Sequence, residues 1–323
     1  MYKTFFGLKS KPFRLNPHLR FLFNGTAMQR VISTLKYGLY QREGLVLLTG
    51  APGSGKTLLI QNISRRLPDA GIQVHVVSTP RADDLSLLRQ IAVNLGLEDS
   101  STDIGGLLNT IQNHLAAGAK DNLRRLLLID EAHNLDDHAL EAIRLLSNMQ
   151  LNGVPLLQIV LVGQPALRTR LMQPRLDSLR QRILVTDHLE DLPAEEVPQY
   201  ILKRLQQAGW HETLPFADEA VRQIHLASHG NPRLINTLCE RLLTQAYVDN
   251  RRHVTAADVT GVVQDIATEW QSEDGLPSID GQESSQQRLQ TLEKRLELLE
   301  ASNSQISQVA KTILVRLDGM RQG

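Results

Sequence analysis

The chain has 323 residues, 41% of them hydrophobic and 22% charged, and its 35 basic and 35 acidic residues give a formal net charge of zero. This length holds about two domains plus an appendage, and the balanced charge gives no support to a globally basic nucleic-acid-binding surface. We expect a cytoplasmic protein. The single cysteine, Cys239, excludes an internal disulfide, no apolar run approaches the ~20 residues that span a bilayer, and basic residues interrupt the region where a signal peptide would lie.

Five short apolar segments alternate with helical patterns over the first part of the chain. The predicted strands are residues 44–49, 72–78, 125–130, 156–163 and 183–188. The predicted helices between them are residues 57–67, 84–94, 104–117 and 138–150. This alternation is typical of a parallel sheet covered by helices on both faces. We therefore predict an α/β domain with a five-stranded parallel sheet over residues 1–192.

A glycine-rich stretch follows the first predicted strand and leads into the first predicted helix. It reads Gly50, Ala51, Pro52, Gly53, Ser54, Gly55, Lys56 and Thr57, and Leu58 follows it. Two glycines with four residues between them, then Lys and Thr, fit the P-loop pattern, in which backbone N–H groups and a helix N-terminus surround a phosphate. We expect Lys56 to reach the β- and γ-phosphates of ATP and the Thr57 hydroxyl to bind Mg²⁺. The flanking strand and helix argue against a chance glycine-rich turn.

Two acidic residues end the third predicted strand. Apolar residues 126–129 lead into Asp130 and Glu131, which is a Walker B pattern. Asp130 is expected to hold Mg²⁺, directly or through water, and Glu131 to polarise the attacking water. A helix-capping Asp followed by a surface Glu is the weaker interpretation, because a P-loop lies on a nearby strand of the same sheet.

A polar residue, Gln164, follows the fourth predicted strand. At that strand end it would face the same crevice, where it is expected to orient water or sense the γ-phosphate. The alternative is a polar residue that only starts a helix before Pro165.

Two arginines, Arg180 and Arg182, precede the fifth predicted strand. One of them is expected to act as an arginine finger on a neighbouring subunit's nucleotide, with Arg182 ahead of Arg180. The alternative is a solvated basic helix end, which the helix dipole also favours.

The strand pattern stops near residue 192, and four amphipathic patterns follow. They predict helices at residues 194–208, 218–228, 232–248 and 255–268, forming a helical lid domain over residues 193–270. Pro198 is awkward for the first of these and indicates a later start. Arg233, in the first turn of the third helix, would point at the phosphates if this domain folds over the nucleotide. A surface arginine is the equal alternative.

The C-terminal part is predicted to be a linker followed by a coiled coil. Residues 271–285 are rich in small and polar residues, as linkers are. Residues 286–318 carry a heptad with Asn303 at an a position, where a buried Asn fixes register and oligomer state. The heptad residues are Leu289, Leu292, Leu296, Leu299, Asn303, Ile306, Ala310, Ile313 and Leu317. A single amphipathic helix folded on the body is the alternative.

These motifs together resemble the AAA+ superfamily and, more narrowly, the secretion ATPase family typified by the A component of the general secretion pathway. The resemblance covers about residues 1–268. It rests on the P-loop and on residues 5–8, 11–13, 37–39, 130–132, 145–148, 162–165, 179–182 and 232–236. The chain is also similar to a branch found beside exosortase and exopolysaccharide genes.

The resemblance implies a fold and a way of working. It implies an AAA+ P-loop αβα core with an α-helical lid, ATP and Mg²⁺ as cofactors, and a homo-oligomer in the form of a ring or filament. In such rings an arginine placed like Arg180 or Arg182 acts across the subunit interface, and one placed like Arg233 acts as a second sensor. The implied partners are inner-membrane components of secretion, pilus or surface-polysaccharide machinery, which would hold the protein peripherally. Typical secretion members continue into a transmembrane helix and a peptidoglycan-binding region, so the linker and heptad found here argue against direct cell-wall contact.

Two other functions remain open from the sequence. One is a DNA-associated transposition or remodelling ATPase with the same core, to which the zero net charge gives no support. The other is a nucleotide-gated scaffold with little hydrolysis, against which the intact Glu131 argues. A two-motor helicase is excluded, because the strand pattern stops before a second α/β domain.

Overall fold

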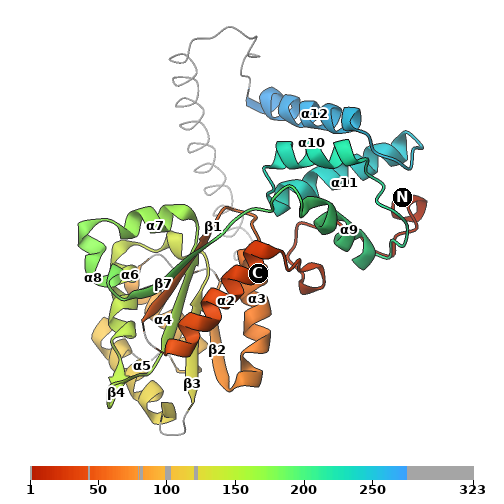
Figure 1. Cartoon of the computed structure of the whole chain (residues 1–323). Helices are drawn as coiled ribbons and strands as arrows, with labels where there is room; N and C mark the ends of the chain where they lie inside the picture. Colours follow the sequence, from red (N-terminus) through yellow and green to blue (C-terminus); the bar gives the residue numbers. More distant parts are fainter. Residues whose placement is uncertain are drawn as a thin grey trace, which may run out of the picture. The chain divides into compact units, whose positions relative to one another are not determined.

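The computed structural model describes residues 2–42, 44–78, 80, 83–98, 103–119 and 123–274. Its centre is a five-stranded sheet of order β2-β3-β6-β1-β7, in which all neighbouring strands are parallel (Figure 1). The strands are β1 (Leu45–Gly50), β2 (Ile72–Val77), β3 (Arg124–Ile129), β6 (Gln158–Gly163) and β7 (Ile183–Leu189). The prediction of an α/β fold with a five-stranded parallel sheet is confirmed.

Helices cover both faces of the sheet, and alternate residues of each central strand pack against opposite layers. In β1, Leu45 and Leu47 belong to one buried cluster and Val46 and Leu48 to the other. The first cluster contains residues of α4 (Asp84–Asn94), α5 (Ile104–Ala119), α6 (Asp137–Ser147), α7 (Pro165–Leu171) and α8 (Asp177–Arg180). The second contains residues of α2 (Thr26–Gln41) and α3 (Lys56–Arg66). Burial on both faces explains why these strands read as continuous apolar runs in the sequence.

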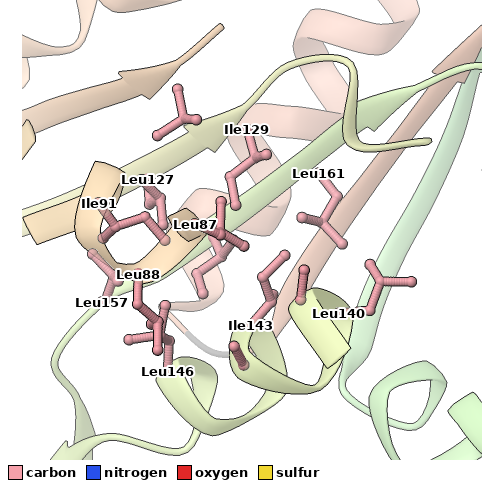
Figure 2. Packing of buried hydrophobic residues seen from close by; sticks show 14 of the residues in the cluster. Leu87, Leu88, Ile91, Leu127, Ile129, Leu140, Ile143, Leu146, Leu157 and Leu161 are labelled. Carbon is pink, nitrogen blue, oxygen red and sulfur yellow. The ribbon is translucent and has the colours of Figure 1, made fainter. Parts of the chain in front are cut away.

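The first layer is drawn from close by in Figure 2, where side chains of α4 and α6 meet those of β3 and β6. The labelled residues are Leu87, Leu88, Ile91, Leu127, Ile129, Leu140, Ile143, Leu146, Leu157 and Leu161. Ile129 is fully buried and directly precedes Asp130. The apolar packing therefore fixes the strand end that carries the two acidic residues.

A helical region follows the sheet, as predicted. It consists of α9 (Val197–Gln207), α10 (Asp218–Ser228), α11 (Pro232–Val248) and α12 (Ala256–Asp274). The first helix starts later than the predicted residue 194, because Pro198 occupies its first turn, where a missing N–H costs nothing. Cys239 is fully buried in α11 and burial raises the pKa of its thiol, so it packs as a core residue. The sheet, the helices before α12 and the start of α12 belong to one compact unit, Met1–Asp265.

The N-terminal segment packs on this helical region before it enters the core. It contains α1 (Tyr2–Phe5) and a 3-10 turn at Leu19–Phe21. The Tyr2 hydroxyl donates to Glu240 Oε2 of α11 at 2.7 Å, and the Lys9 N–H donates to the Ala208 carbonyl at 2.7 Å. The segment then leads into α2, so it joins the helical region to the core.

Several short elements have no counterpart in the sequence-based prediction. The helix α6 ends at Ser147, before the predicted residue 150, because the chain turns into a small antiparallel hairpin. The hairpin strands are β4 (Gln150–Leu151) and β5 (Val154–Pro155), and further 3-10 turns lie at Pro68–Ala70, Ala132–Asn134 and Pro174–Leu176. The predicted domain boundary at residue 192 stays a prediction, and the predicted coiled coil at 286–318 lies outside the described residues. Among the described residues, no helix combines the length and the apolar character that crossing a bilayer needs.

Candidate nucleotide site

The P-loop joins β1 to α3 at the carboxyl end of the central strands. Gly53 and Gly55 have φ angles of 85° and 106°, which L-residues rarely adopt, so glycine is needed where the loop turns into the helix. The Lys56 Nζ donates to the carbonyl oxygens of Gly50 and Ala51, both at 2.8 Å. Burial lowers the pKa of Lys56, while nearby carboxylates oppose this shift. A phosphate in the loop would offer Lys56 a charged partner in place of the two neutral carbonyls.

Thr57 and Asp130 come from different segments and meet beside the loop. Thr57 Oγ1 donates to Asp130 Oδ2 at 3.1 Å, and the Glu131 N–H donates to Asp130 Oδ1 at 2.9 Å. Burial raises the pKa of Asp130, while these two hydrogen bonds and the Lys56 charge oppose the rise. A hydroxyl beside a carboxylate suits Mg²⁺, which takes few protein ligands and completes its shell with water and phosphate oxygens. The residues present therefore fit a magnesium ion that is held together with a nucleotide.

Glu131 and Gln164 line one pocket with the P-loop, and His133 contacts both of them. The His133 Nδ1 lies 3.4 Å from Glu131 Oε2, and the Gln164 N–H donates to the same nitrogen at 3.4 Å. Glu131 has a left-handed backbone with a φ of 54°, which is uncommon for a residue other than glycine and turns the chain sharply after β3. His133 was not among the predicted site residues, because its contact with Gln164 depends on the pairing of β3 with β6.

Arg233 reaches the P-loop from the helical region. A Cβ placed on Gly53 would lie 2.5 Å from Arg233 Cβ and 2.8 Å from Asn231 Oδ1. Asn231 caps α11 and also donates to the Pro52 carbonyl at 3.1 Å. The start of α11 thus lies directly on the loop. Asn231 was not among the predicted site residues. Asn before Pro is typical of a helix start, but no local pattern indicates the contact with Pro52.

The pocket has a volume of about 470 Å³, within the range of small-molecule sites. The P-loop, Glu131, Gln164 and Arg233 line its polar side. Apolar and aromatic residues of the N-terminal segment, α2 and α9 line the other side, among them Phe21, Phe23, Met28 and Tyr200. These residues were not among the predicted site residues, because no motif marks them. A phosphate-binding polar side next to an aromatic side is the arrangement that a nucleotide needs.

Arg180 and Arg182 lie outside this pocket. They stand just before β7, at its amino end, whereas the P-loop follows the carboxyl end of the neighbouring parallel strand β1. A strand of six residues separates these ends by about 20 Å. The Arg180 guanidinium pairs with Asp177 of its own helix, while the exposed Arg182 side chain has no ion pair within the described ranges. Neither arginine is placed to reach the nucleotide of its own subunit.

Comparisons with known proteins agree with this geometry. The family described as AAA domain matches residues 39–171. General secretion pathway protein A of Aeromonas hydrophila is 34% identical over 268 residues, which are 83% of this chain and 49% of that protein. The Holliday junction branch migration complex subunit RuvB of Bifidobacterium adolescentis is 27% identical over 216 residues, 66% of this chain and 52% of that protein. The chain thus spans about half the length of the curated relatives it matches.

Solved structures show the same fold at low sequence identity. Cdc6p of Pyrobaculum aerophilum superposes with a TM-score of 0.57 at 19% identity, over 78% of this chain and 68% of that one. The ORC1 protein of Aeropyrum pernix, solved in complex with DNA, gives 0.57 at 18% identity, over 83% of this chain and 72% of that one. Fold, P-loop geometry and sequence similarity agree, and the chain is an AAA domain protein related to general secretion pathway protein A.

Proposed function

We propose that this protein is an ATP-hydrolysing AAA+ assembly ATPase that serves secretion, pilus or surface-polysaccharide machinery. One observation supports the proposal most directly. Lys56, Thr57 and Asp130 lie together at the carboxyl end of the sheet, with Glu131 and Arg233 in the same pocket. Each of these groups suits a step of phosphoryl transfer. The similarity to general secretion pathway protein A supports the process served, with inner-membrane components as partners and a cytoplasmic location.

The chemistry follows from the roles of these side chains. The loop amides and Lys56 bind the phosphates, and Thr57 and Asp130 hold the Mg²⁺ that offsets charge on the β- and γ-phosphates. Glu131 orients and polarises the attacking water, and Gln164 senses the γ-phosphate. Arg233 stabilises the phosphates from the lid side. Arg182 cannot reach the nucleotide of its own subunit, so a second subunit supplies it to the site. Hydrolysis therefore requires an oligomer.

Changing Glu131 to Gln tests the hydrolysis. Glu131→Gln is expected to bind ATP with affinity near that of the wild type and to lower turnover by about 100-fold or more. Steady-state phosphate release and equilibrium binding of a fluorescent ATP analogue measure the two effects. Glu141→Gln is the matched control, because Glu141 is an exposed α6 residue paired with Arg144 and should keep full turnover. Turnover that survives Glu131→Gln would show that Glu131 is not the base.

The action of Arg182 across an interface is tested by mixing subunits. Arg182→Ala has an intact Glu131, and Glu131→Gln has an intact Arg182, so a mixed oligomer contains some complete sites. Each variant alone is expected to be inactive, and their mixture to regain part of the activity. Arg180→Ala serves as the comparison, because Arg180 is held by Asp177. No recovery at any ratio of the two variants would remove the interface role.

A second candidate function is remodelling of DNA, which the similarity to RuvB favours. Contacts to phosphates would make DNA affinity fall steeply with rising salt. Fluorescence anisotropy with duplex and branched DNA at several salt concentrations separates the two functions. Salt-dependent DNA binding that stimulates ATP hydrolysis would favour DNA remodelling over assembly of a secretion machinery.

A further inference from the structure

We infer that Asn231 is a positioning residue that couples the P-loop to Arg233, so that the nucleotide state of the loop sets the position of the lid arginine. The inference rests on the proposed function and names a residue through which the same site is controlled. Asn231 is buried, with 7% of its surface exposed, and lies between the core and the helical region. It contacts neither the water nor the reacting phosphate in the proposed reaction.

Every hydrogen-bonding group of the Asn231 side chain has a partner, and the partners belong to three different segments. The Nδ2 group donates to the Pro52 carbonyl of the P-loop at 3.1 Å and to Asp191 Oδ1 at 3.0 Å. The Oδ1 atom accepts from the N–H groups of Arg233 and Leu234, at 3.1 and 3.4 Å. A primary amide is the side-chain group that supplies two donors and one acceptor in this geometry. Asparagine is therefore the residue that satisfies the partners in all three segments at position 231.

The P-loop side of this network is sensitive to phosphate. Three consecutive carbonyls of the loop are held by side chains: Gly50 and Ala51 by Lys56, and Pro52 by Asn231. A bound phosphate competes with the first two carbonyls for Lys56, because a charged acceptor makes the stronger hydrogen bond. When Lys56 releases those two carbonyls, the backbone of the loop segment that ends at Pro52 is free to shift. The third carbonyl carries this change to Asn231.

The lid side of the network is the capped start of α11. Asn231 Oδ1 caps the first turn of α11, and Arg233 is the second residue of that helix. A Cβ on Gly53 would lie 2.5 Å from Arg233 Cβ, so loop and helix are already in close contact. Asp191 precedes Leu192, whose N–H donates to the Gly230 carbonyl at 2.9 Å. A shift of Pro52 therefore moves Asn231 and the start of α11 together, and we call the hydrogen bond between Asn231 and Asp191 the hinge contact.

Substitutions at residue 231 separate the cap from the two donors. Asn231→Asp keeps an acceptor for the α11 cap but loses both donors, and it places a second carboxylate beside Asp191. Asn231→Ser also keeps the cap without adding charge. Both variants are expected to lower kcat about tenfold, since small misplacements of a positioned group cost one to two orders of magnitude, with KM for ATP changed less than about threefold. Urea unfolding checks that both variants remain folded.

A paired exchange distinguishes the loop contact from the hinge contact. Asn231→Asp with Asp191→Asn restores one hydrogen bond with its donor and acceptor exchanged, but leaves Pro52 without a donor. The inference expects stability to recover and kcat to stay low. Full recovery of kcat in the double variant would overturn it, because the hinge contact alone would then account for the effect. In an Arg233→Ala background, Asn231→Ser is expected to lower kcat less than twofold further, and a full second tenfold loss would also overturn it.

A readout independent of hydrolysis keeps this inference separate from the proposed function. Hydrogen exchange of the Arg233 and Leu234 amides is measured with and without a non-hydrolysable ATP analogue. The wild type is expected to show a nucleotide-dependent change at these amides, and Asn231→Ser to lose it. Wild-type protein that binds the analogue without this change would overturn the inference. Wild-type protein that shows the change but no phosphate release would overturn the ATPase proposal and leave the coupling established.

Discussion

The two sides of the nucleotide pocket are built in different ways. The core side is made by consecutive residues of one loop and by the acidic pair after β3, all at the carboxyl ends of buried parallel strands of one sheet. The lid side is made by single residues of α9, α11 and the N-terminal segment, which are far apart in the sequence. The strands that carry the core side are packed on both faces. The lid side is joined to the core by polar contacts across a seam, where Pro52, Asp191 and Leu192 meet Gly230 and Asn231.

We expect the two sides of the pocket to have different tasks: the core side binds the nucleotide, and the lid side controls the position of Arg233. A site on consecutive residues between a strand and a helix keeps its geometry as long as the sheet is intact. A site that is closed by Asn231 and Arg233 changes when one contact changes. We therefore expect substitutions on the lid side to change stability and coupling at the seam, and substitutions on the core side to change ligand binding while the fold remains. Three predictions test this division, in order of decreasing effect.

The largest effect is expected at the seam itself, for Gly230→Ala. Gly230 has a φ of 77°, and an added Cβ would collide with the Leu192 carbonyl. Backbone strain and overpacking together are expected to lower the free energy of unfolding by about 3 kcal/mol. Urea denaturation measures this loss. Gly96→Ala is the matched control, because its φ is 80° and no heavy atom lies within 4 Å of the added Cβ.

The control isolates the strain of the left-handed backbone, which is worth about 1 kcal/mol. If the two variants lose the same stability, the seam tolerates the added Cβ. The helical region would then be free to shift, and the contrast between the two sides of the pocket would weaken.

The next prediction concerns the core side and has the opposite sign. Burial raises the pKa of Asp130, so its ionised form is disfavoured in the folded state. Such a raised pKa means that stability is lost as pH rises from about 4 through the folded-state pKa, and the charge costs stability at neutral pH. Asp130→Asn is expected to raise the free energy of unfolding by about 1.5 kcal/mol, within the usual range for a stabilising substitution at a functional site. The Asn amide can still accept from the Glu131 N–H and donate to Thr57 Oγ1.

The same substitution is expected to abolish the dependence of ATP affinity on Mg²⁺. Thermal unfolding at pH 5 and pH 8, with and without Mg²⁺ and ATP, measures both effects. The gain in stability should be larger at pH 8 than at pH 5, because the wild-type carboxylate is more fully ionised there. A loss of stability at pH 8 would mean that the hydrogen bonds of Asp130 outweigh its burial.

The core side of the pocket could be predicted from the sequence to a greater extent than the lid side. The strands, the P-loop and the acidic pair were predictable, because each is a local pattern of apolar, glycine or acidic residues. The position of Arg233 remained undecided between the phosphates and the surface, because the contact with Gly53 joins segments far apart in the chain. Asn231 was not among the predicted site residues, because its contacts with Pro52 and Asp191 join segments that are far apart in the chain. The start of α9 was predictable to within a turn from Pro198.

The smallest effect is expected where the N-terminal segment docks on α11, for Tyr2→Phe. This change removes one hydrogen bond, from the Tyr2 hydroxyl to Glu240 Oε2 at 2.7 Å, and should cost about 1 kcal/mol. Burial raises the pKa of the Tyr2 phenol, so its protonated form is favoured in the folded state and its contribution is present below about pH 10. The loss should therefore be equal at pH 7 and pH 9. Tyr40→Phe is the control, because Tyr40 is 80% exposed.

The segment that Tyr2 anchors continues into the aromatic side of the pocket at Phe21 and Phe23. Looser docking should therefore raise the Kd of a fluorescent ATP analogue about twofold to threefold, while turnover at saturating ATP stays unchanged. This result would add the N-terminal segment to the lid side as a part that adjusts affinity. An unchanged Kd, despite the lost stability, would mean that the core side and α11 hold the nucleotide without the anchor, and that the segment serves the fold alone.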